Sequence, residues 1–282
     1  MKLLRYGQPG AEKPARLDAD GKVRDLSGHV PDIGGAVLTR AGLAAIEALD
    51  PKSLPLVENP GRLGPCVSRV GKFICVGLNY ADHAAETGAK IPEEPILFMK
   101  ATSAITGPND NVIIPRNSKK TDWEVELGVV IGDEARYVTE ADAMNHVAGY
   151  CLINDVSERA FQSERGGQWT KGKSADSFGP IGPWVVTRDE IADPQNLKMW
   201  LSVDGVSRQN GSSKTMIFTV PFLVHYISQF MSLQPGDIIS TGTPPGVGLG
   251  IKPDPIFLYA GQTIKLGIEG LGEQQQLTVD AA

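Results

Sequence analysis

The stretch TDWEVELGVVIG, residues 121–132, decides how the rest of the chain is interpreted. Its apolar and β-branched residues predict a strand, in which successive side chains point to opposite faces. Glu124 and Glu126 then share one face, and Trp123, Val125 and Leu127 share the other. Two interpretations are open. The pair could lie on the solvated face of an antiparallel strand, which is the commoner situation, or it could supply ligands to a metal.

Composition and charge narrow the classes of protein. The 282 residues, with 41% hydrophobic and 21% charged residues, are ordinary for a globular enzyme with one large domain and a smaller one. A formal charge of −6 argues against nucleic acid as a partner, because that binding needs clustered Lys and Arg. No apolar run is long enough for a membrane span, and no signal peptide is expected. Three sparse cysteines, Cys66, Cys75 and Cys151, favour reduced thiols and a cytoplasmic location.

The chain divides into two predicted domains. In residues 1–69, Asp20-Gly21 between two short runs predicts a hairpin, and TRAGLAAIEALD predicts a helix, so we expect a small β-rich N-terminal domain. Proline and glycine punctuate residues 53–72 and place the boundary near Val70. Residues 70–282 then form the catalytic domain.

The catalytic domain reads as strands joined by short helices. Thr139 predicts the cap of a helix that joins the strand ending at Ile131 to VAGYCLIN, so those strands are expected to be neighbours. Thr219 and Pro221 begin a longer helix. Further strands are predicted at FICVGL, PILFMK, GDIIS, TIKLGIEG and QQQLTV.

A third carboxylate follows from that neighbour relationship. VAGYCLIN brings Asp155 to its carboxyl end, where it can meet Glu124 and Glu126. Three anions need a cation, and oxygen ligands without a His or Cys cluster select Mg²⁺, Mn²⁺ or Ca²⁺ over zinc. The alternative is that Asp155 caps a helix spanning DVSERAFQ.

Within that helix, Arg159 and Gln162 would follow Asp155 on one face, where the guanidinium could hold a substrate carboxylate. An exposed pair between Arg159 and Glu158 or Glu164 is an equally good interpretation.

In NYADHAAE, His83 and Glu86 lie three residues apart on one face of a short helix, so the carboxylate can orient the imidazole and help it remove a proton from water. An ordinary surface histidine is the commoner occurrence of this pattern. Gly88 and Pro92 after the helix are typical of a mobile lid.

Two loops complete the set. Lys171 and Lys173 lie in QWTKGKSADSFGPIGP, where one lysine could stabilise an oxyanion or both could be solvated. STGTPPGVGLG offers backbone amides to a small anionic ligand at the end of a strand. It is not a nucleotide-binding motif, because no GK[ST] or GxGxxG spacing is present.

Five motifs together carry a resemblance that covers about residues 70–280. The chain resembles the fumarylacetoacetate hydrolase family in the order and spacing of NYADHAAE, TDWEVELGVVIG, YCLINDVSERAFQ, KGKSADSFGPIGPW and ISTGTPPGVG. The resemblance implies an α+β, β-rich fold: a mixed β-roll or distorted barrel with peripheral helices, a small N-terminal β-rich domain and a homodimer. FMKATSAI departs from the family, because Ala101 stands where members often have proline.

The resemblance also assigns roles. It implies Mg²⁺ or Mn²⁺ on Glu124, Glu126 and Asp155, a water-activating His83–Glu86 pair, and Lys173 as oxyanion stabiliser. The positions that it places at the substrate are Arg159, Gln162, Thr243, Asn79 and Tyr80.

The implied reaction is hydrolysis of a carbon–carbon bond in a β-diketo acid of the acylpyruvate type, giving pyruvate and a carboxylic acid. The full-length pattern is most similar to bacterial hydrolases of 2,4-diketo-3-deoxy-L-rhamnonate or L-fuconate, which give pyruvate and lactate. Ureidoglycolate lyase, oxaloacetate decarboxylase and unsaturated-dioate isomerase activities are alternatives on the same site. A metal-stabilised binding module is the alternative without turnover.

Overall fold

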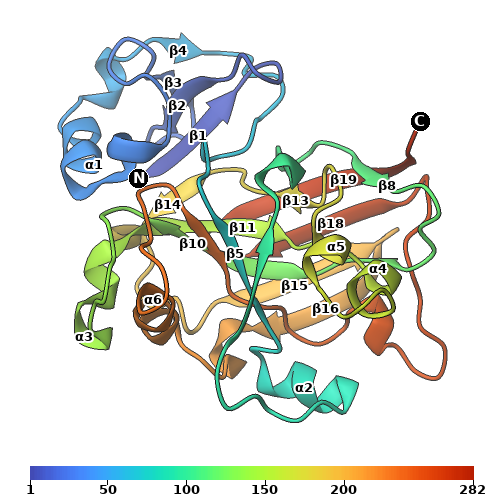
Figure 1. Cartoon of the computed structure of the whole chain (residues 1–282). Coiled ribbons are helices and arrows are strands. Elements are labelled where there is room, and N and C mark those ends of the chain that lie inside the picture. Colours follow the sequence, from blue (N-terminus) through green and yellow to red (C-terminus); the bar gives the residue numbers. More distant parts are fainter.

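The computed structural model describes residues 1–282 and is built around one long mixed sheet (Figure 1). Most neighbouring strands are antiparallel, but β17 and β5 run parallel. The strands in spatial order are β4 (Leu56–Val57), β3 (Val23–Asp25), β2 (Lys13–Leu17), β1 (Lys2–Tyr6), β14 (Val185–Thr187), β11 (Val147–Asn154), β10 (Val125–Ile131), β17 (Ile238–Ser240), β5 (Phe73–Gly77) and β6 (Ile96–Lys100).

A second sheet of five strands lies beside the first. Its strands in spatial order are β16 (Val206–Ser212), β15 (Lys198–Val203), β18 (Thr263–Ile268), β19 (Gly272–Asp280) and β8 (Val112–Ile114). Two short pairs also form, β9 (Thr121–Asp122) with β12 (Ser157–Glu158), and β7 (Ile105–Thr106) with β13 (Gly179–Pro180).

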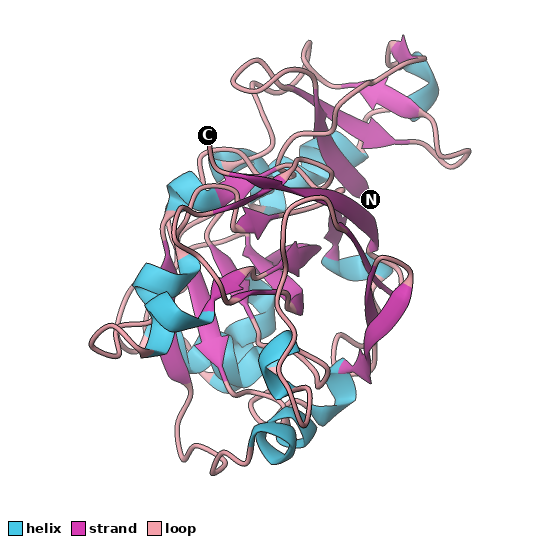
Figure 2. Ribbon diagram, turned by 90° about the vertical axis from the view of Figure 1, so that its right-hand side faces the viewer, coloured by secondary structure: helices cyan, strands magenta, loops and turns pink.

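The helices are short and lie around the strands, as Figure 2 shows. They are α1 (Arg40–Glu47), α2 (Ala81–Thr87), α3 (Glu140–Ala143), α4 (Arg159–Ser163), α5 (Thr170–Lys173) and α6 (Val220–Ser228). The 3₁₀ turns are Gly35–Leu38, Pro51–Ser53, Thr102–Ala104, Met144–His146, Arg188–Glu190, Ser213–Thr215 and Gly248–Gly250. None of the helices has both the length and the apolar character that crossing a bilayer requires.

The predicted helix starts at Thr139 and Thr219 are confirmed. Each accepts a hydrogen bond from a backbone N–H in the first turn of α3 or α6, and Thr39 caps α1 in the same way. Each hydroxyl satisfies an N–H that has no partner inside its helix. The predicted β-rich α+β fold with peripheral helices is therefore confirmed.

The central strands are buried on both faces, which explains why TDWEVELGVVIG is apolar almost throughout. Val125, Leu127 and Val129 of β10 pack in a core with β15 and β18 of the second sheet. Val130 faces the other way, into a core shared with α1 and the N-terminal segment. Glu124 and Glu126 are therefore not on a solvated face, and that interpretation is wrong.

The N-terminal segment extends the large sheet. The hairpin predicted around Asp20-Gly21 forms between β2 and β3. β1 pairs antiparallel with both β2 and β14, so hydrogen bonds run from the N-terminal strands into the rest of the sheet. The segment stands at the top of Figure 1, in blue, with α1 beside it. A domain boundary near Val70 stays a prediction.

Candidate active site

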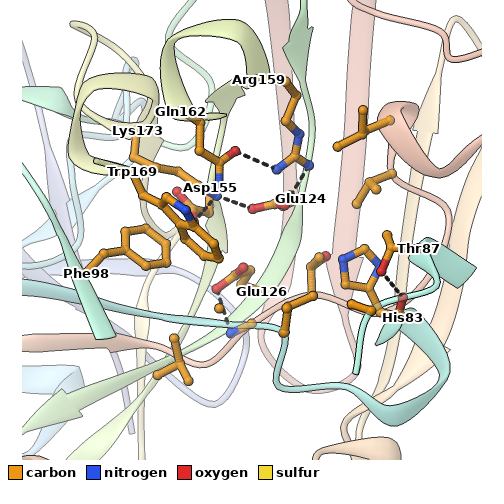
Figure 3. Close-up of a pocket in the computed structure, with 18 of the residues that line it drawn as sticks. His83, Thr87, Phe98, Glu124, Glu126, Asp155, Arg159, Gln162, Trp169 and Lys173 are labelled. Atoms are coloured by element: carbon orange, nitrogen blue, oxygen red, sulfur yellow. Dashed lines mark hydrogen bonds and ion pairs between the residues drawn. The ribbon is translucent and has the colours of Figure 1, made fainter. Parts of the chain in front are cut away.

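Two adjacent strands bring the three carboxylates together. β10 and β11 pair with Glu126 opposite Ile153, and the Asp155 N–H continues the ladder by donating to the Glu124 carbonyl at 2.9 Å. Ligand oxygens of Glu124, Glu126 and Asp155 all lie within 4.8 Å of one another. The three residues are 5%, 2% and 1% exposed, so they form a buried acidic cluster at the floor of a cavity (Figure 3).

Asp155 does not cap a helix. The chain stays extended through β12, and α4 begins only at Arg159, where the Glu158 side chain accepts from the Ala160 N–H. The predicted helix over DVSERAFQ is thus wrong in its first turn, because β12 pairs with β9 and holds this segment extended. Arg159 and Gln162 still share a face of α4, with Arg159 Nη1 donating to Gln162 Oε1 at 3.2 Å.

Two cations that line the cavity pair with the acidic cluster. Lys173 Nζ lies 2.5 Å from Glu124 Oε2 and 2.8 Å from Asp155 Oδ2. Arg159 donates from Nη2 to Glu124 Oε1 at 2.7 Å and from Nε to Asp122 Oδ2 at 2.8 Å. The predicted exposed pair of Arg159 with Glu158 or Glu164 is therefore wrong, because the guanidinium is buried and pairs with Asp122 and Glu124.

The environment separates the proton affinities of the two glutamates. Burial raises the pKa of Glu124, but Arg159 and Lys173 more than offset burial, so this carboxyl has a pKa well below its ordinary value. Burial and the charges of Asp155 and Glu124 raise the pKa of Glu126. Burial lowers the pKa of Lys173, yet Asp155 and Glu124 outweigh it and raise that pKa above the usual value, which keeps the ammonium protonated.

The cluster has the donor set that a hard divalent cation requires. Glu126 Oε2 accepts from Ser240 Oγ at 2.6 Å and from the Gly242 N–H at 2.9 Å, which leaves its second oxygen for another ligand. Asp155 Oδ1 is buried and forms no hydrogen bond, and the Lys100 ammonium pairs with it at 2.7 Å. Such all-oxygen sets fit Mg²⁺ or Mn²⁺, so these three residues could hold the ion that the resemblance implies.

His83 and Glu86 form the predicted pair on α2. His83 Nδ1 lies 3.0 Å from Glu86 Oε2, and the other Glu86 oxygen accepts from the Gly246 N–H at 2.9 Å. The imidazole is largely buried and lines the same cavity as the acidic cluster. With Nδ1 held by a carboxylate, Nε2 is the nitrogen available to accept a proton.

The cavity has a volume of about 250 Å³. One wall is aromatic: Phe98 and Trp169 meet edge to face with centroids 5.2 Å apart, and Gly77 leaves room for the indole. The opposite wall comes from α2 and from the loop after β17. In Figure 3, Lys173, Gln162 and Arg159 approach the acidic cluster from one side, and His83 lies on the other.

The loop STGTPPGVGLG donates amides to the protein's own carboxylates rather than to an empty anion site. The N–H groups of Gly248 and Leu249 donate to the two oxygens of Asp122, at 2.6 and 3.0 Å. The amides of Gly242 and Gly246 are bound to Glu126 and Glu86. The predicted anion-binding use of this loop therefore has to be corrected, because the loop instead fixes three acidic side chains.

The other predicted residues divide between the cavity and the core. Gln162 and Thr243 line the cavity, although the Thr243 hydroxyl is already used by the Val125 carbonyl and by Gln209. Asn79 and Tyr80 are fully buried beside it and do not line it. Asn79 holds backbone groups of Phe218 and Thr241, and the Tyr80 hydroxyl contacts Met199 Sδ at 3.3 Å.

Among the lysines of the predicted basic loop, only Lys173 reaches the cluster. Lys171 is exposed and donates to the Arg165 carbonyl.

Sequence reasoning missed two residues of this site. Asp122 lies two positions before Glu124, so strand periodicity would have placed it on the same face. Lys100 ends the predicted strand PILFMK, and its Nζ lies 2.7 Å from Asp155 Oδ1. A lysine that ends an apolar strand is a weak signal, because such a residue is usually solvated.

Known proteins match the chain over its whole length. A protein of Burkholderia multivorans described as "Putative hydrolase" is 66% identical over 278 residues, which are 99% of each chain. A solved fumarylacetoacetate hydrolase from Exiguobacterium antarcticum is 36% identical with a TM-score of 0.88, and both chains are covered completely.

Two further solved structures show the range of activities on this fold. A maleylpyruvate hydrolase from Sphingobium sp. SYK-6, in complex with manganese(II) and pyruvate, is 27% identical with a TM-score of 0.80 and full coverage of both chains. A 5-carboxymethyl-2-hydroxymuconate delta-isomerase from Mycobacterium smegmatis is 31% identical with a TM-score of 0.76 and the same coverage.

The family described as "Fumarylacetoacetate (FAA) hydrolase C-terminal" matches residues 72–279, which include every residue of the site. The five ordered motifs, the β-rich fold and the full-length matches agree. The chain is an enzyme of the fumarylacetoacetate hydrolase family.

Proposed function

We propose that the protein is a divalent-metal-dependent hydrolase that cleaves the carbon–carbon bond of an acylpyruvate-type β-diketo acid. The observation that carries this proposal is that His83, the acidic cluster and Lys173 line one cavity although they come from separate elements. Attack of water on a ketone needs a base to deprotonate the water and an ammonium to stabilise the oxyanion. A cation site is needed to stabilise the anionic leaving group. The similar maleylpyruvate hydrolase, solved with manganese(II) and pyruvate, supports it.

The acidic cluster would hold Mg²⁺ or Mn²⁺, which when bound supplies Lewis-acid polarisation and orients a 2-oxo acid. His83 Nε2 accepts a proton from water, and Glu86 on Nδ1 stabilises the imidazolium. The hydroxide adds to the distal carbonyl, where the Lys173 ammonium stabilises the oxyanion. The bond between that carbon and the methylene then breaks, and the methylene carbon takes up a proton to give pyruvate and a carboxylic acid.

Substrate contacts follow from the groups that remain free in the cavity. Gln162 uses its Oε1 on Arg159, so its amide Nε2 is available to donate to the substrate. Arg159 already contacts Asp122, Glu124 and Gln162, so it offers the substrate only its remaining N–H groups. We propose 2,4-diketo-3-deoxy-L-rhamnonate or L-fuconate as substrate, on the full-length sequence resemblance, and a homodimer as the working form.

The test is pyruvate release in a lactate-dehydrogenase-coupled assay from a panel of acylpyruvates and diketo-deoxy sugar acids. Protein stripped with EDTA is assayed with and without Mg²⁺ or Mn²⁺, and Glu126→Ala serves as the control without a complete cluster. We expect metal-dependent pyruvate from the sugar acids. Intact sugar acids together with cleavage of ureidoglycolate would refute the proposed substrate.

Isomerisation of an unsaturated dioate is a second candidate, because the similar delta-isomerase shares the fold over its whole length. The His83–Glu86 pair separates the two, since activated water is consumed in hydrolysis and not in isomerisation. Decarboxylation of oxaloacetate is separated in the same way. His83→Ala should abolish hydrolysis and spare these reactions, and equal loss of both would contradict the role given to His83.

A further inference from the structure

Lys100 is the last residue of β6 and is buried. It has no part in the proposed function as general base, metal ligand or oxyanion stabiliser. Its side chain is fully buried and does not line the cavity. Nζ lies 2.7 Å from Asp155 Oδ1, donates to the Val156 carbonyl at 3.2 Å, and donates to the Lys173 carbonyl. The ammonium therefore donates to two backbone carbonyls and forms an ion pair with the Asp155 carboxylate.

Lys100 contacts groups from two separate segments of the site. Asp155 and Val156 lie at the end of β11, and Lys173 is the last residue of α5. Lys173 in turn reaches Asp155 Oδ2 with its own Nζ. Asp155 therefore lies between the ammonium groups of Lys100 and Lys173. The Lys100 ammonium also donates to the backbone carbonyl of Lys173.

Two more contacts join β6 and the residue after it to the C-terminal end of α5. The Ala101 N–H donates to Ser174 Oγ at 2.9 Å. Lys173 Nζ lies 5.2 Å from the centroid of the Phe98 ring, within the range of a cation–π contact. Ala101 can make its bond only because it has an N–H, which a proline at this position would lack.

We propose that Lys100 is a positioning residue for Lys173. It fixes the backbone from which the Lys173 side chain extends, and it holds Asp155 at Oδ1 so that Oδ2 faces the Lys173 ammonium. This inference rests on the proposed function, in which Lys173 stabilises the oxyanion.

The charge of Lys100 gives the inference a distinctive signature. An ammonium beside Asp155 repels a divalent cation bound to the same carboxylate, so its removal does not weaken the electrostatic attraction for the ion. The oxyanion, in contrast, loses a correctly placed Lys173. Loss of Lys100 should therefore lower kcat while divalent-ion affinity is retained or increased, with KM less affected than kcat.

The experiment compares Lys100→Met, which keeps a long unbranched side chain, one atom shorter, and removes its charge, with Ser174→Ala and Lys72→Met. Lys72 is the matched control, because it also pairs with a buried aspartate: its Nζ lies 2.6 Å from Asp237. It precedes β5, close to the end of β6, and it does not line the cavity. The measurements are kcat and KM with the best diketo acid, Mn²⁺ affinity by calorimetry, thermal unfolding, and crystal structures of the variants.

We expect Lys100→Met to lose about 10- to 100-fold in kcat, the range known for residues that orient the ligands of a metal site without binding the metal themselves. Ser174→Ala should lose less, and Lys72→Met should keep wild-type kcat. In the Lys100→Met crystal, Lys173 Nζ should have left its place between Glu124 and Asp155. A kcat equal to that of wild type, an undisturbed Lys173, or a loss fully matched by weaker Mn²⁺ binding would overturn the inference.

The crystal structure and the calorimetry need no turnover, so they keep the two proposals separate. If wild-type protein releases no pyruvate from any diketo acid, the proposed function fails, while the position of Lys173 in Lys100→Met still decides the role of Lys100.

Discussion

Glu86 joins His83 to the loop after β17 in the same wall of the cavity: one oxygen lies 3.0 Å from His83 Nδ1, and the other accepts from the Gly246 N–H at 2.9 Å. Gly250 also packs against this carboxylate, because a Cβ at Gly250 would lie 2.6 Å from Glu86 Cδ. The carboxylate therefore orients the imidazole and also connects α2 to the loop that contains Gly246.

Replacing His83 with Ala or Glu86 with Gln should lower kcat for hydrolysis by about 10²- to 10⁴-fold, the usual contribution of general-base catalysis. The larger loss is expected for His83→Ala, which removes the base itself. Lys90→Ala, which breaks an exposed pair with Glu93 in the segment after α2, is the control and should keep wild-type kcat. A wild-type rate in His83→Ala would rule out His83 as the base.

Glu126→Gln should weaken Mg²⁺ and Mn²⁺ binding strongly, since the variant replaces a charged ligand oxygen in a cluster of three. Isothermal titration calorimetry measures the affinity directly, and the rise of the melting temperature with added metal gives an independent readout. Glu273→Gln alters an exposed glutamate on β19 and should bind metal like the wild type. Equal affinities of Glu126→Gln and wild type would refute the assignment of Glu126 as a ligand.

Arg159→Met should destabilise the metal-free protein by about 3–5 kcal/mol, because it leaves the buried Asp122 and Glu124 without a guanidinium partner. Urea unfolding in EDTA measures this loss. Saturating Mn²⁺ should reduce it, since the ion replaces part of the missing positive charge. Arg159→Lys should recover only part of the stability, because an ammonium cannot bind both carboxylates in the geometry of the guanidinium fork.

Gly77→Ala should raise KM and lower stability by about 1–3 kcal/mol, the usual cost of overpacking. The new Cβ would lie 2.3 Å from Trp169 Cζ3, so the indole must move within the cavity wall. Tryptophan fluorescence reports that movement. Gly28→Ala, which meets no atom within 4 Å, is the matched control, and a Gly77→Ala protein with unchanged KM would show that the wall does not shape the site.

Tyr6 supplies a pH dependence outside the active site. Burial and its hydrogen bond to Asp25 raise the pKa of the phenol from 10.0 to about 12. A pKa that is higher in the folded state gives stability that is fully present below pH 10 and is lost as the pH rises from 10 to about 12. Urea unfolding at pH 8 and pH 11 should show this loss in wild type, and Tyr6→Phe should show less of it.

The sequence alone determined the order of the elements and the identity of most site residues. Period-two alternation placed Glu124 and Glu126 on one face, the caps Thr139 and Thr219 marked two helix starts, and the neighbouring strands β10 and β11 were inferred from the short helix between them. These features are local, because each depends on residues a few positions apart.

Only the tertiary structure decided what those residues contact. Local sequence cannot show whether a strand is covered on both faces, so it left the glutamates between solvent and a metal site. It predicted a helix from Asp155 because it could not see β9 pairing with β12, and it left Arg159 open to surface partners because its true partner Asp122 lies 37 positions away. It also passed over Lys100, whose ammonium meets Asp155 and Lys173 only after β6, β11 and α5 have packed together. Contacts between distant segments are set by the packing of whole elements, and that information is spread over the entire chain.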